Sequence, residues 1–191
     1  MRIVAGIQKG RRLKEPDGQD LRPTSARVRE ALLSILAHHI EGARVLDLYA
    51  GTGALGLESL SRGAHQAVFV DNDVASSRIL CENIARCGYR NQCLVISQDV
   101  ETFLTSPPSF GEPPTFDLIF VDPPYRGTDL PRLLEQLSVS GKIAPQGTLV
   151  LEHFFKHAVP DGTGDLVQTR QSRYGDTMLT FYQPAAEATC D

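Results

Sequence analysis

The chain has 191 residues, of which 41% are hydrophobic and 22% charged, a composition typical of a soluble globular protein. Its longest apolar runs, such as 117–121, fall far short of the roughly 20 residues that a membrane span needs. The polar first residues and the spacing of the four cysteines predict free thiols, no secretion signal, no metal site and a cytoplasmic location.

Charge is distributed unevenly along the chain. The net charge is −4, but residues 1–29 hold eight Lys and Arg against three acidic residues, a net +5 that leaves −9 elsewhere. A basic segment on an acidic body is typical of proteins that bind a polyanion such as RNA, although a merely solvated surface is the alternative. The expected phosphate contacts are Lys9, Arg11, Arg12, Arg22, Arg27 and Arg29.

The first 25 residues have no helical period, and we expect a basic N-terminal arm over 1–25. Residues 2–6 and 10–14 are candidates for a short paired hairpin, with a glycine near each bend. Apolar residues at helical spacing then predict a helix over 26–39, which begins after Thr24 or Ser25 as its cap.

Strands and helices are expected to alternate from residue 44 onward. The predicted strands are 44–49, 67–71, 93–97, 117–122, 148–153, 165–170 and 176–182, and the predicted helices lie near 54–62, 74–87, 100–105 and 130–139. This alternation predicts an α/β fold with a doubly wound, seven-stranded, mainly parallel, Rossmann-like sheet. The domain is expected over 26–183, with a loop at 106–116 and a disordered tail at 184–191.

The first predicted strand runs into a glycine-rich turn and then a helix, which is the first crossover of a nucleotide-binding sheet. The spacing of Gly51, Gly53 and Gly56 also fits a dinucleotide site. Asp47 favours another ligand, because a buried carboxylate beside this turn repels pyrophosphate but attracts the sulfonium and ammonium groups of S-adenosylmethionine. The dinucleotide reading and a ligand-free tight turn remain as alternatives.

Acidic residues follow the next two predicted strands. A carboxylate at Asp71 is suited to the ribose hydroxyls, and one at Asp99 to the adenine amino group. For both residues the alternative is a helix cap, a role that Asn72 or Asp73 could equally fill after the second strand. The expected cofactor-binding residues are Asp47, Tyr49, Ala50, Gly51, Thr52, Gly53, Asp71, Asn72, Asp99 and Val100.

The fourth predicted strand ends in Asp122, Pro123, Pro124 and Tyr125, which we expect to be catalytic. An exocyclic base amine is a poor nucleophile, because its lone pair is delocalised into the ring. Hydrogen bonds to Asp122 and to the Pro123 carbonyl orient that lone pair, the prolines fix the backbone, and Tyr125 offers a face on which the base stacks. The alternative is a proline turn without chemistry.

These motifs together resemble the bacterial small-subunit ribosomal RNA guanine-N2 methyltransferases, the family that modifies guanine 966 of 16S RNA. The resemblance covers roughly residues 1–182 and rests on segments 2–6, 10–11, 22–24, 27–32, 47–56 with Glu58, 122–125 and 173–177. Tyr49 stands where the family most often has Phe, and 106–116 resembles an insertion.

The resemblance implies a class I methyltransferase fold and methyl transfer from S-adenosylmethionine to the N2 amine of a guanine in 16S RNA. It further implies S-adenosylhomocysteine as the product, no metal, and a monomer that acts on an assembling small subunit. The residues alone lead only to an exocyclic amine of a base. A DNA adenine-N6 methyltransferase, a non-catalytic RNA-binding assembly factor and a dinucleotide dehydrogenase are the alternatives.

Overall fold

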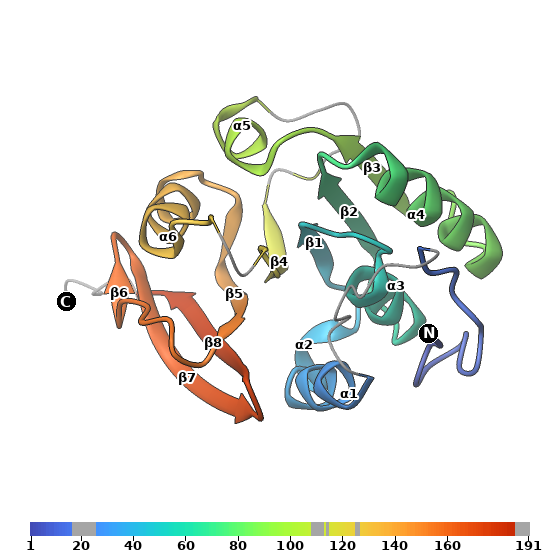
Figure 1. Cartoon of the computed structure of the whole chain (residues 1–191), viewed down its shortest axis with the longest axis horizontal. Helices are drawn as coiled ribbons and strands as arrows, with labels where there is room; N and C mark the ends of the chain where they lie inside the picture. Colours follow the sequence, from blue (N-terminus) through green and yellow to red (C-terminus); the bar gives the residue numbers. More distant parts are fainter. Residues whose placement is uncertain (17–25, 108–112, 114, 125–126, 186–191) are drawn as a thin grey trace.

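The computed structural model describes residues 1–16, 26–107, 113, 115–124 and 127–185, and within them eight strands form one sheet (Figure 1). The strands are β1 (Arg44–Leu48), β2 (Gln66–Asp71), β3 (Cys93–Ser97), β4 (Phe116–Val121), β5 (Ile143–Phe154), β6 (Gly162–Thr163), β7 (Leu166–Tyr174) and β8 (Thr177–Pro184). Their order is β3-β2-β1-β4-β5-β8-β7-β6. The first five pair in parallel, whereas β5–β8, β8–β7 and β7–β6 are antiparallel.

Helices cover both faces of this sheet. They are α1 (Ala26–Ile35), α2 (Ala37–Ile40), α3 (Ala54–Ser61), α4 (Val74–Cys87), α5 (Val100–Thr105) and α6 (Leu130–Val139). Alternate strand residues point to opposite faces, so Val45 packs with α1 to α4 in one core, and Leu46 packs with α5 and α6 in the other. The α/β, doubly wound prediction is therefore confirmed.

Four details differ from the sequence prediction. The sheet has an eighth strand, because the two-residue β6 pairs with the start of β7 and is too short to leave an apolar pattern. The predicted helix 26–39 is interrupted at Leu36, between α1 and α2. Strand β5 begins at Ile143, five residues earlier than expected, and β8 continues to Pro184, inside the expected tail. Residues 186–191 lie outside the described part.

The order of the parallel strands reverses between β1 and β4: β2 and β3 follow on one side of β1, and β4 and β5 lie on its other side. Leu48 at the end of β1 is in register with Val70 of β2 and with Val121 of β4. The residues that follow these strand ends therefore lie along one edge. Open α/β sheets bind their ligands at such a switch point, outside the carboxyl ends of the strands.

The described part of the N-terminal segment, residues 1–16, forms a small hairpin against α3 and α4. Arg2 pairs with Arg12 in an antiparallel bridge, and Ile3 N–H donates to the Arg11 carbonyl at 3.0 Å. Ile3 and Leu13 are each only 2% exposed, so the hairpin is anchored by burial of apolar side chains.

Two expectations from composition concern cysteines and membranes. Cys81, Cys87 and Cys93 are free thiols, and Cys190 lies outside the described residues. None of the helices described here is long and apolar enough to cross a bilayer.

Candidate active site

The glycine turn between β1 and α3 has a conformation that other residues resist. Gly51 and Gly53 have φ of 54° and 76°, in the left-handed region. A Cβ on Gly53 would lie 2.2 Å from Leu80 Cδ1, and one on Gly56 would lie 2.4 Å from Phe69 Cε1. A Cβ on Gly51 would have its nearest neighbour, the Tyr49 carbonyl oxygen, at 4.0 Å, so the space beside this glycine is open.

The carboxylate of Asp71 is fixed beside this turn. Its Oδ2 accepts from Gly51 N–H at 2.7 Å, and its Oδ1 accepts from Asp73 N–H at 2.8 Å. Asp73 itself caps α4, accepting from the N–H groups of Ala75 and Ser76. The cap is thus Asp73, which leaves Asp71 half-buried at the glycine turn, while Asn72 is exposed.

Asp47 lies beneath the turn, with 3% of its surface exposed, and its Oδ2 accepts from Gly56 N–H at 2.9 Å. Burial, with smaller contributions from Asp122 and Asp71, raises the pKa of Asp47 to about 8. Burial thus favours the protonated form of this carboxyl, whereas the sequence pattern led us to expect an anion. The three carboxyl groups of Asp47, Asp71 and Asp122 lie at one edge of the sheet, and this arrangement suits a cationic ligand better than a pyrophosphate.

The raised pKa of Asp47 predicts how stability depends on pH. Because the folded state keeps the proton until about pH 8 and the unfolded chain releases it near 3.8, the free energy of unfolding falls as pH rises between these values. Asp47→Asn removes this term and still offers an oxygen to Gly56 N–H. We expect the variant to gain stability relative to the wild type from pH 5 to pH 8, measured by urea unfolding.

Asp117 provides a control, because its pKa is shifted in the opposite direction to that of Asp47. Hydrogen bonds from Arg44 lower the pKa of Asp117, so its contribution to stability is present at neutral pH and is lost as pH falls through the folded pKa. Asp117→Asn should therefore lose stability relative to the wild type only as pH rises toward 3.8, and its stability curve should run parallel to that of the wild type from pH 5 to pH 8. Parallel pH curves for the wild type and Asp47→Asn would contradict the assignment for Asp47.

Tyr49 directly follows β1, and Asp99 directly precedes α5. Tyr49 has φ of 57°, a strained value for a residue with a side chain, and burial with the charges of Asp99 and Glu101 raises its pKa to about 12. Asp99 caps α5, because its Oδ1 accepts from the N–H groups of Glu101 and Thr102. Asp99 therefore acts as the helix cap that was the alternative to adenine binding, and the next residue, Val100, is buried. Contact of Asp99 with adenine stays a prediction.

The expected catalytic loop follows β4, at the same edge as the glycine turn. Asp122 is half-buried, Pro123 is buried and Pro124 is exposed. The Pro124 carbonyl accepts from Thr128 Oγ1 at 3.3 Å, which ties the loop to the start of the next segment. Tyr125 lies outside the described residues. Among those that are described, no group of three or more His, Cys, Asp or Glu side chains could hold a metal ion.

Asn83 links the N-terminal hairpin to the glycine turn and was missed from the sequence. Its side chain is fully buried, accepts from Lys14 N–H at 2.7 Å, and donates to the carbonyls of Lys14 and Thr52 at 3.1 and 3.0 Å. The available signal was a polar residue on the apolar face of α4, between Leu80 and Ile84. This contact fixes Thr52, one of the expected cofactor-binding residues.

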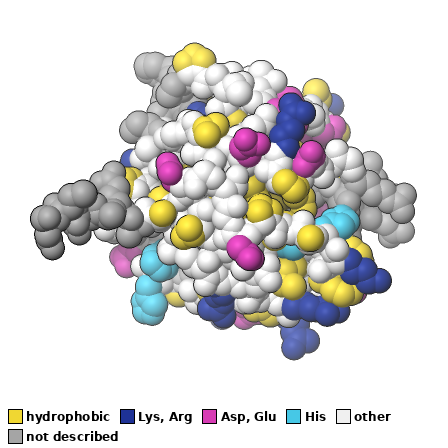
Figure 2. Space-filling model, turned by 90° about the vertical axis from the view of Figure 1, so that its left-hand side faces the viewer, with side chains coloured by type: hydrophobic (Ala, Val, Ile, Leu, Met, Phe, Trp, Pro, Cys, Tyr) yellow, Lys and Arg dark blue, Asp and Glu magenta, His cyan; other side chains and the backbone are white. Residues whose placement is uncertain are grey.

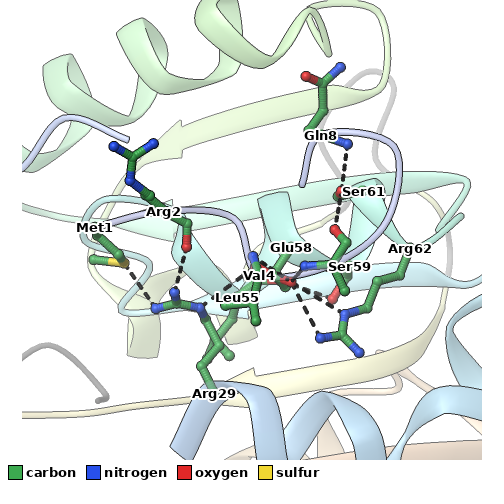
Figure 3. Close-up of polar contacts among 12 residues, drawn as sticks. Met1, Arg2, Val4, Gln8, Arg29, Leu55, Glu58, Ser59, Ser61 and Arg62 are labelled. Carbon is green, nitrogen blue, oxygen red and sulfur yellow. Dashed lines mark hydrogen bonds and ion pairs between the residues drawn. The ribbon is translucent and has the colours of Figure 1, made fainter. Parts of the chain in front are cut away.

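Arg29 was expected to contact RNA, but it lies inside the protein (Figure 3). It is 1% exposed, donates to the Arg2 carbonyl and to Met1 Sδ, each at 2.9 Å, and places its Nε 3.8 Å from Glu58 Oε2. Burial lowers its pKa, although Glu58 opposes the shift. The prediction for Arg29 was therefore wrong, because this guanidinium holds the N-terminal segment instead of facing solvent.

Glu58 is the partner that makes this burial possible. The carboxylate is fully buried and accepts hydrogen bonds from the N–H groups of Val4 and Ala5, the shortest at 2.8 Å (Figure 3). Arg62 lies 3.3 Å from Glu58 Oε1, one helical turn away on the same chain segment. Glu58 therefore joins α3, α1 and the start of the chain in one polar cluster.

The remaining basic residues of the predicted RNA surface differ in position. Lys9, Arg11 and Arg12 are exposed on the hairpin, and Arg27 is exposed at the start of α1. Arg11 Nε donates to Gln8 Oε1 at 3.1 Å, which orients its guanidinium. Arg22 lies outside the described residues.

The sequence as a whole matches one protein family. The family described as "Conserved hypothetical protein 95" matches residues 1–183. Ribosomal RNA small subunit methyltransferase D of Escherichia coli (strain K12) is 35% identical over 191 residues, which are 100% of this chain and 93% of that protein. The chain belongs to this methyltransferase D family.

Solved structures agree with the fold. The yhhF protein from Escherichia coli aligns with a TM-score of 0.85 at 34% identity, covering 98% of this chain and 99% of that one. A SAM-dependent methyltransferase from Agrobacterium tumefaciens aligns with a TM-score of 0.62 at 18% identity, over 82% of this chain and 62% of that one. The fold is therefore the Rossmann-like class I methyltransferase fold.

Proposed function

We propose that this protein transfers a methyl group from S-adenosylmethionine to the exocyclic N2 amine of a guanine in 16S ribosomal RNA. The products are the methylated RNA and S-adenosylhomocysteine. We further propose that it works in the cytoplasm as a monomer, on an assembling small ribosomal subunit, without a metal. The choice of substrate is supported by the name of the Escherichia coli relative, a ribosomal RNA small subunit methyltransferase.

One observation carries the chemical part of this proposal. Asp122 follows β4 directly beside the glycine turn that follows β1, and both loops lie at the switch point of the sheet. A base amine held by Asp122 is then close to a cofactor held by the turn. The open space beside Gly51 and the carboxylate of Asp71 are suited to that cofactor.

The protein groups act mainly by positioning. The cofactor supplies an electrophilic methyl group on a sulfonium, so the amine nitrogen needs orientation more than prior deprotonation. Asp122 and the Pro123 carbonyl accept the two amine N–H groups, which aligns the nitrogen lone pair with the methyl carbon. The amine becomes acidic as the new bond to carbon forms, and Asp122 is placed to hold the proton that leaves.

Loss of the Asp71 carboxylate should weaken cofactor binding. Asp71→Asn removes a charged acceptor that also holds Gly51, and such hydrogen bonds contribute about 1.5–3 kcal/mol, which is roughly a 10- to 150-fold loss of affinity. Calorimetry with S-adenosylmethionine measures this. Asp73→Asn, two residues away at the α4 cap, is the matched control and should bind normally. Equal affinity in Asp71→Asn and the wild type would remove Asp71 from the site.

The hairpin is expected to bind RNA phosphates. Replacing Arg11 and Arg12 together by Ala should weaken binding to small-subunit RNA and reduce the slope of log affinity against log salt by roughly 0.7–0.9 per phosphate lost. Binding titrations at several salt concentrations check this, with cofactor affinity as the internal control. An unchanged slope would mean that the hairpin does not dock the RNA.

Methyl transfer to competing substrates tests the function itself. Purified protein with labelled S-adenosylmethionine should methylate 16S RNA or small-subunit particles from cells that lack this activity, and should leave DNA unlabelled. Label in DNA adenine would support the DNA methyltransferase alternative. Tight RNA binding without any transfer would support a non-catalytic assembly factor.

A further inference from the structure

A second basic surface lies away from the N-terminal hairpin, where α1 meets the turn between β7 and β8. A pocket of about 410 Å³ opens there, lined by Arg27, Val28, Arg173, Tyr174 and Gly175. Arg27 comes from the start of α1, and the other basic side chain, Arg173, comes from the end of β7. Two exposed guanidinium groups and a half-buried tyrosine ring therefore line one hollow.

The Arg173 guanidinium is held in place although it is exposed. Its central carbon lies 3.6 Å from the centroid of the Phe155 ring, and its Nε donates to the Gly175 carbonyl at 2.8 Å. Neither contact uses the two terminal amino groups. A guanidinium fixed by stacking loses little freedom on binding, and its terminal N–H groups match the paired oxygens of a phosphate.

The segment after β5 continues this surface. Phe155 N–H donates to the Asp176 carbonyl at 3.0 Å, which fixes the segment to the β7–β8 turn. Lys156 is exposed, with Nζ 5.6 Å from the Phe155 ring centroid, and His157 stands edge-on to Phe154 at 5.6 Å. Cations thus alternate with aromatic rings, as on surfaces that bind nucleic acid by phosphate contact and base stacking.

This surface leads toward the expected catalytic loop. Lys156 and His157 also line a second hollow, of about 500 Å³, together with residues 127–131, which follow the Asp122 loop. Figure 2 faces the side that carries α6, β6 and β7, and shows Lys and Arg side chains gathered at its lower right beside hydrophobic ones. Because Lys156 lines the hollow that follows the Asp122 loop and, like Arg173, lies over the Phe155 ring, an RNA strand whose target base lies at Asp122 can continue over Lys156 to Arg173.

We propose that the pocket between α1 and the β7–β8 turn binds a nucleotide of the substrate RNA that flanks the target base. Its phosphate binds between Arg27 and Arg173, and its base packs against Tyr174, while Lys156 contacts the backbone on the way to the catalytic loop. The inference rests on the proposed function, because it assigns a second contact to the same substrate. With this pocket, the proposed RNA-binding surface has two parts, the N-terminal hairpin on one side of the catalytic edge and the pocket on the other.

The test compares Arg27→Ala with Arg173→Ala, singly and together, against Arg170→Ala. Arg170 lies on the same strand, is exposed and packs over Phe181, outside the pocket. The double variant should raise KM for small-subunit RNA by about 10-fold or more and reduce the salt slope of binding, because two charged contacts are lost. Its kcat and its affinity for S-adenosylmethionine should stay near those of the wild type and of Arg170→Ala.

Arg173→Lys distinguishes the effect of the guanidinium's shape from the effect of its positive charge. It keeps the positive charge but loses the planar stack on Phe155 and the paired N–H groups, so it should recover only part of the affinity. A double variant with wild-type KM and salt slope overturns this inference and leaves the proposed function standing. A wild-type protein that neither binds nor methylates RNA overturns both.

Discussion

Asp122→Ala is expected to abolish most of the methyl transfer while the protein still binds its cofactor. The residue follows β4 and is half-buried at the edge where the glycine turn lies, so its loss frees the amine to rotate away from the methyl group. Misplacement of a reacting group costs on the order of 100-fold in rate or more. Single-turnover rates with small-subunit RNA measure the effect, and calorimetry measures cofactor affinity.

Asp122→Asn separates geometry from charge in the same experiment. The amide retains one acceptor oxygen but cannot hold the departing proton, so we expect an intermediate rate. Thr128→Val is a control close by, because it removes only the hydroxyl that donates to the Pro124 carbonyl. Single-turnover rates for Asp122→Ala that equal the wild type would remove Asp122 from the mechanism.

Glu58→Gln is expected to cause the largest loss of stability. The fully buried carboxylate faces Arg29, which is itself 1% exposed, and it also accepts from Val4 and Ala5 (Figure 3). Breaking a buried ion pair from one side leaves the other charge uncompensated, at a cost of about 3–5 kcal/mol. Urea unfolding measures the free energy, and hydrogen exchange should show residues 1–16 opening first.

Two further variants test the reason for that loss. Glu82→Gln removes an exposed ion pair with Lys14 and should leave the unfolding midpoint unchanged. Arg29→Met combined with Glu58→Gln should be more stable than the sum of the two single changes, because the more deeply buried of the two cations beside Glu58 has gone and only Arg62 remains. A Glu58→Gln protein with a wild-type midpoint would show that the cluster does not hold the segment.

The sequence was sufficient for the fold and the edge that carries the site. Continuous apolar strands alternating with helices lead to a doubly wound sheet, and residues such as Asp71 and Asp122 follow directly from where strands end. The two-residue β6 left no such pattern, since pairing with β7 and not apolar burial defines it. Local periodicity therefore predicts the core strands better than the edge.

Roles that depend on distant partners could not be read in the same way. Arg29 belonged to a basic run, and only its approach to Glu58, 29 positions later, turns it from a surface charge into a buried one. Burial likewise raises the pKa of Asp47, although the sequence alone led us to expect an anion there. Asn83 gave one weak signal, a polar residue on an apolar helix face.

Analysis of the modified nucleoside tests the central claim most directly. Small-subunit particles from cells that lack this activity are incubated with the protein and S-adenosylmethionine, and their 16S RNA is digested to nucleosides for mass spectrometry. We expect N2-methylguanosine with the wild-type protein and none with Asp122→Ala. Methylation at another nucleoside, or the same yield with Asp122→Ala, would contradict it.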